Sequence, residues 1–219
     1  MEHHLEVFDD LDSLSEAAAE LVAARARKAA EADGMFRFAV SGGRSPWEMF
    51  GRLTRLDVPW DRTVIWQVDE RVAPSGDADR NLTHLRQALG DKAADVRPMP
   101  VEEEDIDAAA ARYAAGLPDY FDVVHLGIGP DGHTASLVPT DPVLRVEDRL
   151  VAVTATAYEG RRRMTLTYPG LGRARQLLWI VSGADKREPL EKLLAGDASI
   201  PAGRVEAAAS LVMADRTAA

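Results

Sequence analysis

The residues best suited to chemistry lie in one short stretch, residues 122–139 (DVVHLGIGPDGHTASLVP). It opens with an apolar, β-branched run typical of a strand buried on both faces of a parallel sheet. Three glycines and a proline then end the strand, and Asp131, His133, Thr134 and Ser136 follow within this break or just after it. An imidazole beside a carboxylate at the carboxyl end of a strand predicts acid–base chemistry where α/β sheets bind ligands.

Other interpretations of this stretch stay open. Residues 127–132 match the G-x-G-x-x-G pattern of dinucleotide-binding loops, but Pro130 removes an amide from the turn and the match lies in mid-chain. His133 could instead be a structural histidine. Ser136 and His133 could also form a nucleophile–base pair, although no nucleophile elbow surrounds the serine.

A glycine turn follows an earlier predicted strand at residues 35–40. The segment Ser41-Gly42-Gly43-Arg44-Ser45-Pro46 comes next, and its proline suits the first turn of a helix. A turn of this kind leaves free N–H groups and the positive end of a helix dipole facing one point, which favours an anion. The alternative is an ordinary glycine turn, and the G-K-[ST] ending of a Walker loop is missing.

Charged residues directly follow the next predicted strand at residues 63–68. They are Asp69, Glu70 and Arg71. They form either a solvated turn or part of a site, and the expected closeness of this strand to the 35–40 strand favours a site. Further on, Asn81 is predicted to open a helix that carries His84 as a structural residue.

Basic residues accompany two later strands. A run of three arginines ends at Arg163, just before a sheet-like segment, and Lys186 follows a strand predicted at residues 177–182. Because parallel strands place their carboxyl ends on one edge of a sheet, we expect these cations to lie near His133. One base, a few carboxylates and an excess of cations predict a site for a phosphorylated substrate that needs acid–base chemistry.

The remaining pattern predicts a single α/β domain, residues 1–219, with a mostly parallel sheet. A helix is expected to begin at a capping box made by Ser13 and Glu16 and to end at Gly34. The sequence contains no internal repeat, no linker and no sign of a second hydrophobic core.

Composition excludes several classes of protein. The absence of cysteine excludes disulfides, thiolate catalysis and cysteine metal sites. A net charge of −10 argues against a nucleic-acid binder, although a local cluster of cations can still hold a phosphate. No apolar run approaches the ~20 residues that cross a bilayer, and the acidic N-terminus does not resemble a secretion signal, so a cytoplasmic location is expected.

Several segments together resemble the glucosamine-6-phosphate isomerase/6-phosphogluconolactonase family, and within it the lactonases. They are SGGRSP at 41–46, DERVAP at 69–74 with Asn81, GIGPDGHTASLVP at 127–139 and RMTLT at 163–167. They come in the family's order, and the resemblance covers nearly the whole chain. It implies a Rossmann-like three-layer α/β/α sandwich and hydrolysis of 6-phospho-D-glucono-1,5-lactone to 6-phospho-D-gluconate in the oxidative pentose phosphate pathway. It also implies that no cofactor and no metal take part.

The resemblance suggests a role for each candidate residue. His133 would act as the general base on water, oriented by Asp131, while Asp69 and Arg71 complete the catalytic set and Arg71 or loop amides stabilise the oxyanion. The residues expected to bind the phosphorylated substrate are Gly42, Gly43, Arg44, Ser45, Asn81, Arg163 and Lys186. The expected partner is a phosphorylated sugar lactone, with no nucleic acid and no membrane, and the working expectation is a monomer.

Two rivals remain at this point. Related sugar-phosphate deaminases, by resemblance, carry a glutamate before the proline of the histidine loop and an aromatic residue after the Asp-Glu pair. This chain has Val138 and Arg71 at those positions, which favours a lactonase. The second rival is a non-catalytic sugar-phosphate sensor, which would not need His133.

Overall fold

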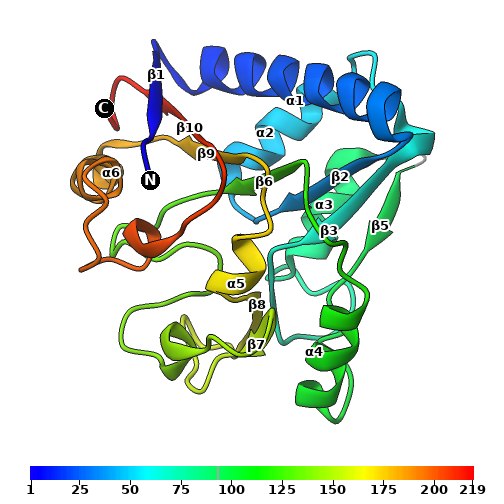
Figure 1. Ribbon diagram of the computed structural model, residues 1–219, viewed down its shortest axis with the longest axis vertical. Coiled ribbons are helices and arrows are strands. Elements are labelled where there is room, and N and C mark those ends of the chain that lie inside the picture. Colours follow the sequence, from blue (N-terminus) through cyan, green and yellow to red (C-terminus); the bar gives the residue numbers. More distant parts are fainter. Residues whose placement is uncertain (93) are drawn as a thin grey trace.

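The computed structural model describes residues 1–92 and 94–219, apart from the side chain of Arg44. Within this part of the chain, parallel strands form a seven-stranded sheet in the order β1-β10-β9-β6-β2-β3-β5 (Figure 1). Its strands are β1 (His4–Phe8), β2 (Phe36–Val40), β3 (Thr63–Gln67), β5 (Asp95–Arg97), β6 (Val123–Leu126), β9 (Leu177–Val181) and β10 (Ser210–Asp215). The predicted mostly parallel α/β sheet is therefore confirmed.

Helices and irregular segments cover both faces of this sheet. The helices are α1 (Leu11–Asp33), α2 (Arg44–Leu53), α3 (Asn81–Leu89), α4 (Ile106–Ala115), α5 (Tyr168–Leu171) and α6 (Arg187–Leu194). Short 3-10 turns lie at Trp60–Arg62, Pro142–Arg145, Ala184–Lys186 and Ala202–Arg204. Figure 1 shows α1 and α2 on one side of the sheet and α4 and α5 on the other, which is the predicted three-layer sandwich.

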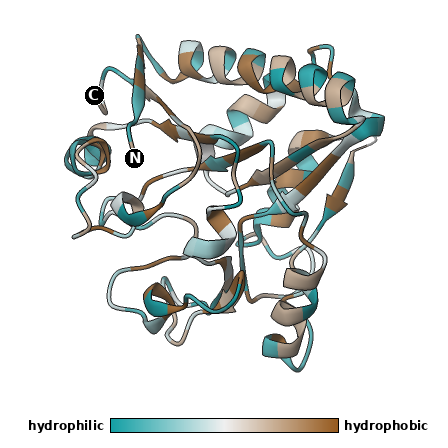
Figure 2. Ribbon diagram, viewed as in Figure 1, coloured by the Kyte–Doolittle hydropathy of each residue, from teal (hydrophilic) through white to brown (hydrophobic). Residues whose placement is uncertain are grey.

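Alternation along the strands divides the core between these two sides. On β2, Phe36, Phe38 and Val40 are buried with α1 and α2, whereas Ala39 is buried with the opposite cluster, which includes residues of α4. Successive side chains of a strand point to opposite faces, so a strand covered on both sides is apolar at most of its positions. Figure 2 shows this as hydrophobic colour along the central strands, while α1 carries both hydrophobic and hydrophilic residues.

The order of the strands places a crevice between β2 and β6. The two strands are neighbours, with Val40 opposite His125, but the chain leaves β2 toward β3 and leaves β6 toward β9 on the other side. The loops beyond their carboxyl ends therefore diverge, which is where open α/β sheets bind ligands. These are the glycine turn at 41–43 and the glycine-rich loop at 127–133.

A second, antiparallel sheet has the order β4-β8-β7 and contains β4 (Asp69–Arg71), β7 (Val151–Val153) and β8 (Arg163–Leu166). The Asp69–Arg71 segment is a strand, and its first two residues are buried, which excludes the alternative of a solvated turn. The same sheet corrects the expected place of Arg163. Arg163 comes from the start of an antiparallel strand, where it pairs with Arg71, and it does not belong to the parallel edge.

The start of α1 also differs from the prediction. Asp10 is the N-cap, and its carboxylate accepts the N–H of Ser13 at 2.8 Å while the Ser13 hydroxyl accepts the N–H of Asp10 at 3.2 Å. Ser13 is thus the N3 residue of the capping box rather than its N-cap. Glu16 lies within the helix and pairs with Arg52 at 3.0 Å. The predicted end of the helix is confirmed, because Gly34 adopts a left-handed φ of 75°.

Candidate active site

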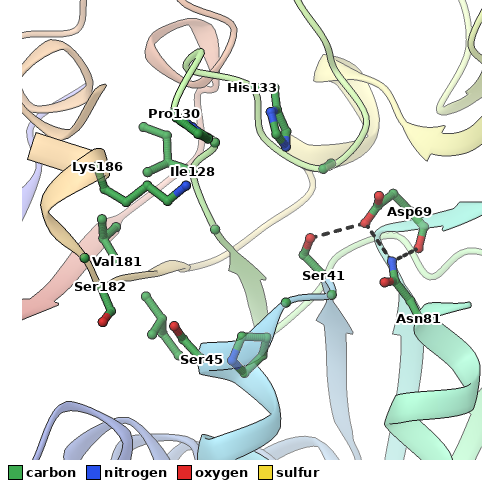
Figure 3. Close-up of a pocket in the computed structure, with 18 of the residues that line it drawn as sticks. Ser41, Ser45, Asp69, Asn81, Ile128, Pro130, His133, Val181, Ser182 and Lys186 are labelled. Carbon is green, nitrogen blue, oxygen red and sulfur yellow. Dashed lines mark hydrogen bonds between the residues drawn. The ribbon is translucent and has the colours of Figure 1, made fainter. Parts of the chain in front are cut away.

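A cavity of about 550 Å³ opens at the carboxyl ends of β2, β6 and β9 (Figure 3). Many of the predicted site residues line it: Gly42, Gly43, Ser45, Asp69, Arg71, Asn81, His133, Arg163 and Lys186. Lys186 enters from one side in Figure 3, Ser41 and Asp69 lie on the opposite side, and His133 lies above Ser45. Asp131 lies behind His133, outside the lining, and the prediction for the Arg44 side chain falls outside the described residues.

His133 and Asp131 form a hydrogen-bonded pair. Nδ1 of the imidazole lies 2.6 Å from Oδ1 of Asp131, which also accepts the backbone N–H of His133 at 3.1 Å. Burial alone would raise the pKa of Asp131, but the charge of His133 and these hydrogen bonds outweigh it and lower the pKa. An ionised carboxylate at Nδ1 leaves Nε2 as the nitrogen available to a ligand in the cavity.

Glycines hold the loop of His133 in place. The N–H of Gly129 donates to the carbonyl of His133 at 2.8 Å, and the N–H of Gly132 donates to the carbonyl of Gly129 at 2.9 Å. A Cβ at Gly129 would lie 2.0 Å from Nδ1 of His133, so a side chain there would displace the imidazole. Gly132 has a φ of 79°, and a Cβ there would lie 2.5 Å from Ile200. The glycine spacing therefore serves the close approach of the histidine.

The same loop does not open a helix after its third glycine, since turns and isolated bridges continue to Pro139. A dinucleotide fingerprint requires a helix at that point, so the G-x-G-x-x-G match lacks its structural context. His84, expected to be structural, lies on α3 outside the cavity lining, where its Nε2 is 2.8 Å from the carbonyl of Ala78.

Tyr158 is a site residue that the sequence interpretation missed. Its hydroxyl donates to Oδ2 of Asp131 at 3.1 Å and lies 3.3 Å from Nδ1 of His133. The two rings meet edge-on with centroids 5.1 Å apart. Burial, together with the neighbouring charge of Asp131, raises the pKa of Tyr158 to about 12. No motif marks this tyrosine, because its partners lie more than twenty residues earlier in the chain.

Asp69 belongs to a hydrogen-bond network with two serines and an asparagine. It is buried, and its carboxylate accepts hydrogen bonds from Ser41 Oγ at 3.2 Å and from Ser136 Oγ at 2.6 Å. The amide of Asn81 donates to its carbonyl oxygen at 3.0 Å. Ser136 is thus bonded to Asp69 and not to His133, so the alternative nucleophile–base pair is not formed. The geometry suits Asp69 to positioning its neighbours rather than to accepting a proton from substrate.

Glu70 extends this network to the first turn of α3, outside the cavity lining. Its carboxylate accepts the N–H groups of Asn81 and Leu82 at 2.8 and 2.9 Å, which satisfies the first turn of α3. It also pairs with the buried guanidinium of Arg80, with Nε at 3.0 Å from Oε2. The acidic pair after β3 therefore fixes the position of Asn81, the residue that lines the cavity.

Three cations face the cavity from different elements. Arg71 donates to Oδ1 of Asn81. Arg163 is buried, donates to Glu159 at 2.8 Å, and holds its guanidinium carbon 5.0 Å from the ring centroid of Tyr158. Lys186 lies 3.0 Å from Asp185. With the backbone of Gly43 at the start of α2, these groups form a polar pocket suited to an anion.

Gly42 lets the glycine turn approach Asn81 closely. A Cβ at Gly42 would lie 2.0 Å from Oδ1 of that residue, so only glycine fits.

Among the described residues, no group of three or more histidine, aspartate or glutamate side chains is placed to hold a metal ion. No helix in the same part of the chain is long and apolar enough to cross a bilayer.

Comparisons with known proteins show what this chain is similar to. The family model described as Glucosamine-6-phosphate isomerases/6-phosphogluconolactonase matches residues 9–213. A 6-phosphogluconolactonase from Synechocystis is 33% identical over 212 residues, covering 90% of this chain and 88% of the relative. The crystal structure of a 6-phosphogluconolactonase from Shewanella baltica superposes with a TM-score of 0.89 at 25% identity, covering 98% of both chains.

A different activity occurs on the same fold. A structure described as a monomeric glucosamine-6-phosphate deaminase superposes with a TM-score of 0.85, covering 100% of this chain and 98% of that one. Its sequence identity is 18%, so the likeness is one of fold alone. The architecture therefore does not separate the two reactions, and the residues of the site must do so.

Proposed function

Because the chain belongs to the family of glucosamine-6-phosphate isomerases and 6-phosphogluconolactonases, we propose that it hydrolyses 6-phospho-D-glucono-1,5-lactone to 6-phospho-D-gluconate. The observation that carries the proposal is the His133–Asp131 pair at a cavity that also contains Arg163 and Lys186. A base and a phosphate pocket in one cavity match the two ends of this substrate.

His133 acts as the general base in this mechanism. Asp131 holds the Nδ1–H tautomer, so the lone pair on Nε2 accepts a proton from water as the water oxygen attacks C1 of the lactone. A positioned base of this kind contributes about 10²–10⁴-fold in rate. A lactone is an activated ester, so no covalent nucleophile is required, which agrees with the engagement of Ser136 by Asp69.

Attack converts the carbonyl oxygen into an oxyanion. Arg71 lines the cavity and uses one of its five N–H donors on Asn81, which leaves others for this charge. One well-placed donor supplies roughly 3–4 kcal/mol. Collapse of the tetrahedral intermediate breaks the bond between C1 and the ring oxygen, and the imidazolium of His133 returns its proton to that oxygen.

The 6-phosphate rests on Arg163, Lys186 and the amides at the start of α2. Arg163 and Lys186 supply charge, and Gly42 and Gly43 allow the backbone to approach the phosphate oxygens. The reaction belongs to the oxidative pentose phosphate pathway. The predicted cytoplasmic location, monomeric state and single domain spanning residues 1–219 stay predictions.

The test is acid release from freshly generated 6-phosphogluconolactone, measured above its spontaneous hydrolysis, with unphosphorylated gluconolactone alongside. Fast hydrolysis that depends on the phosphate supports both the reaction and the pocket. Equal rates on the two lactones would refute the phosphate pocket. Release of ammonia from glucosamine 6-phosphate, with no lactonase activity above background, would overturn the proposal in favour of a deaminase.

A further inference from the structure

Tyr158 contacts both members of the His133–Asp131 pair, although it comes from a separate turn of the chain. The turn is closed by backbone hydrogen bonds between Tyr158 and Arg161, and it precedes β8. The phenol oxygen lies within hydrogen-bond distance of Asp131 and His133, and the ring packs edge-on against the imidazole. This places a tyrosine beside the base, on the side of Nδ1.

The protons available to these groups decide which of them donate and which accept. A phenol has one proton, and Tyr158 donates it to Oδ2 of Asp131. Its oxygen can then only accept from Nδ1 of His133, as Oδ1 of Asp131 does at 2.6 Å. Because both groups beside Nδ1 are acceptors, Nδ1 must carry the hydrogen, and in the neutral ring Nε2 is left bare toward the cavity.

The phenol also restrains the carboxylate itself. Oδ1 of Asp131 serves the backbone and ring of His133, and Oδ2 serves Tyr158, so both oxygens are held and the carboxylate cannot rotate freely. The charged groups around the phenol are Asp131, Glu159 and Arg163, with the titratable imidazole of His133 beside them. The hydrogen bond from the phenol offsets part of the negative charge that Asp131 would otherwise direct at the imidazole.

We propose that Tyr158 is a positioning residue for the base: it orients Asp131, the carboxylate that holds the His133 tautomer whose Nε2 faces the substrate. The inference rests on the proposed lactonase function. It goes beyond a packing role, because a tyrosine that only filled space would need its ring and not its hydroxyl.

The kinetic test is Tyr158→Phe, which keeps the ring and removes the hydroxyl. We expect kcat to fall about five- to tenfold, the effect of one hydrogen bond, with KM nearly unchanged. Without the phenol, more negative charge remains beside the imidazole and favours its protonated form. The acid limb of the kcat/KM profile should therefore move to higher pH.

The matched control is Tyr120→Phe. Tyr120 also donates to a carboxylate, Asp33 at 2.6 Å, but it lies outside the cavity lining. This variant should keep both kcat and the pH profile. If Tyr158→Phe retains the wild-type kcat and pH profile while the wild-type chain hydrolyses the lactone, the positioning role is wrong and the proposed function stands.

A measurement without substrate separates the two proposals further. In ¹⁵N-histidine-labelled protein, the imidazole signals of His133 can be assigned by their loss in His133→Ala. The wild type should show the Nδ1–H tautomer, and Tyr158→Phe should keep that tautomer with a shifted Nδ1 resonance, because Asp131 remains the acceptor at Nδ1 while its carboxylate has lost the phenol that restrains it. An unchanged Nδ1 resonance in Tyr158→Phe would overturn the inference, whatever the activity of the chain.

Discussion

His125 and His133 lie on the same strand–loop segment, yet their imidazoles meet opposite environments. His125 is on β6, fully buried, and neither ring nitrogen has a hydrogen-bond partner among the described residues. Burial lowers its pKa to about 3. His133 lies on the following loop with 21% of its side chain exposed, and its Nδ1 is held by Asp131. One imidazole is kept neutral in the core, and the other is placed to exchange protons.

The difference shows how the backbone assigns a role to a residue type. A strand buried on both faces seals its side chains from water, so a histidine there stays neutral and takes no part in proton transfer. A glycine-rich loop at the end of that strand brings the next histidine to a polar cavity and a carboxylate. Substitutions in the loop, the cavity and the core should therefore differ in what they affect.

Replacing the loop histidine should have the largest effect. His133→Ala removes the general base, and we expect kcat to fall about 10²–10⁴-fold while binding of 6-phosphogluconate survives. The control is His84→Ala, which removes a half-buried histidine outside the cavity and should leave kcat unchanged. Steady-state lactonase kinetics and calorimetric binding measure both; full turnover by His133→Ala would contradict the mechanism.

Removing a cation from the cavity should weaken substrate binding and leave proton transfer at His133 nearly unchanged. Lys186→Ala deletes a charge that faces the cavity, and we expect KM to rise about tenfold or more with little change in kcat. Lys192→Ala is the matched control, because that lysine pairs with Glu188 on the exposed side of α6. A fall in kcat alone would argue against a phosphate-binding role for Lys186.

The buried histidine should affect stability rather than catalysis. Between pH 6.5 and about 3 the unfolded chain binds a proton at His125 that the folded chain does not, so the free energy of unfolding falls as the pH drops through this window. His125→Leu removes this pH dependence and two unpaired ring nitrogens. It should raise the free energy of unfolding by about 1 kcal/mol near pH 8 and by more at acid pH. Urea denaturation at several pH values measures it; parallel curves for wild type and variant would refute it.

Local sequence patterns predicted most of the elements. The apolar runs at 35–40, 63–68, 122–128 and 177–182 all contain core strands, because continuous apolar character is what a doubly covered strand requires. The predicted start of α1 was wrong because Asp10 and Ser13 can both cap a helix, and only the backbone conformation distinguishes between them. The position of Arg163 in a separate antiparallel sheet depends on strand pairing, which no local pattern specifies.

The loops that form the site follow from local sequence, since glycines and polar residues directly after buried strands leave the chain little alternative. The sequence also indicated the family and the motif that carries His133 and Asp131. Folding set the partners of each carboxylate. Asp69 accepts hydrogen bonds from Ser41 and Ser136, whereas Asp131 contacts the imidazole of His133. Tyr158 joins that pair from a distant turn, because hydrogen-bond partners are chosen by folding and not by nearness along the chain.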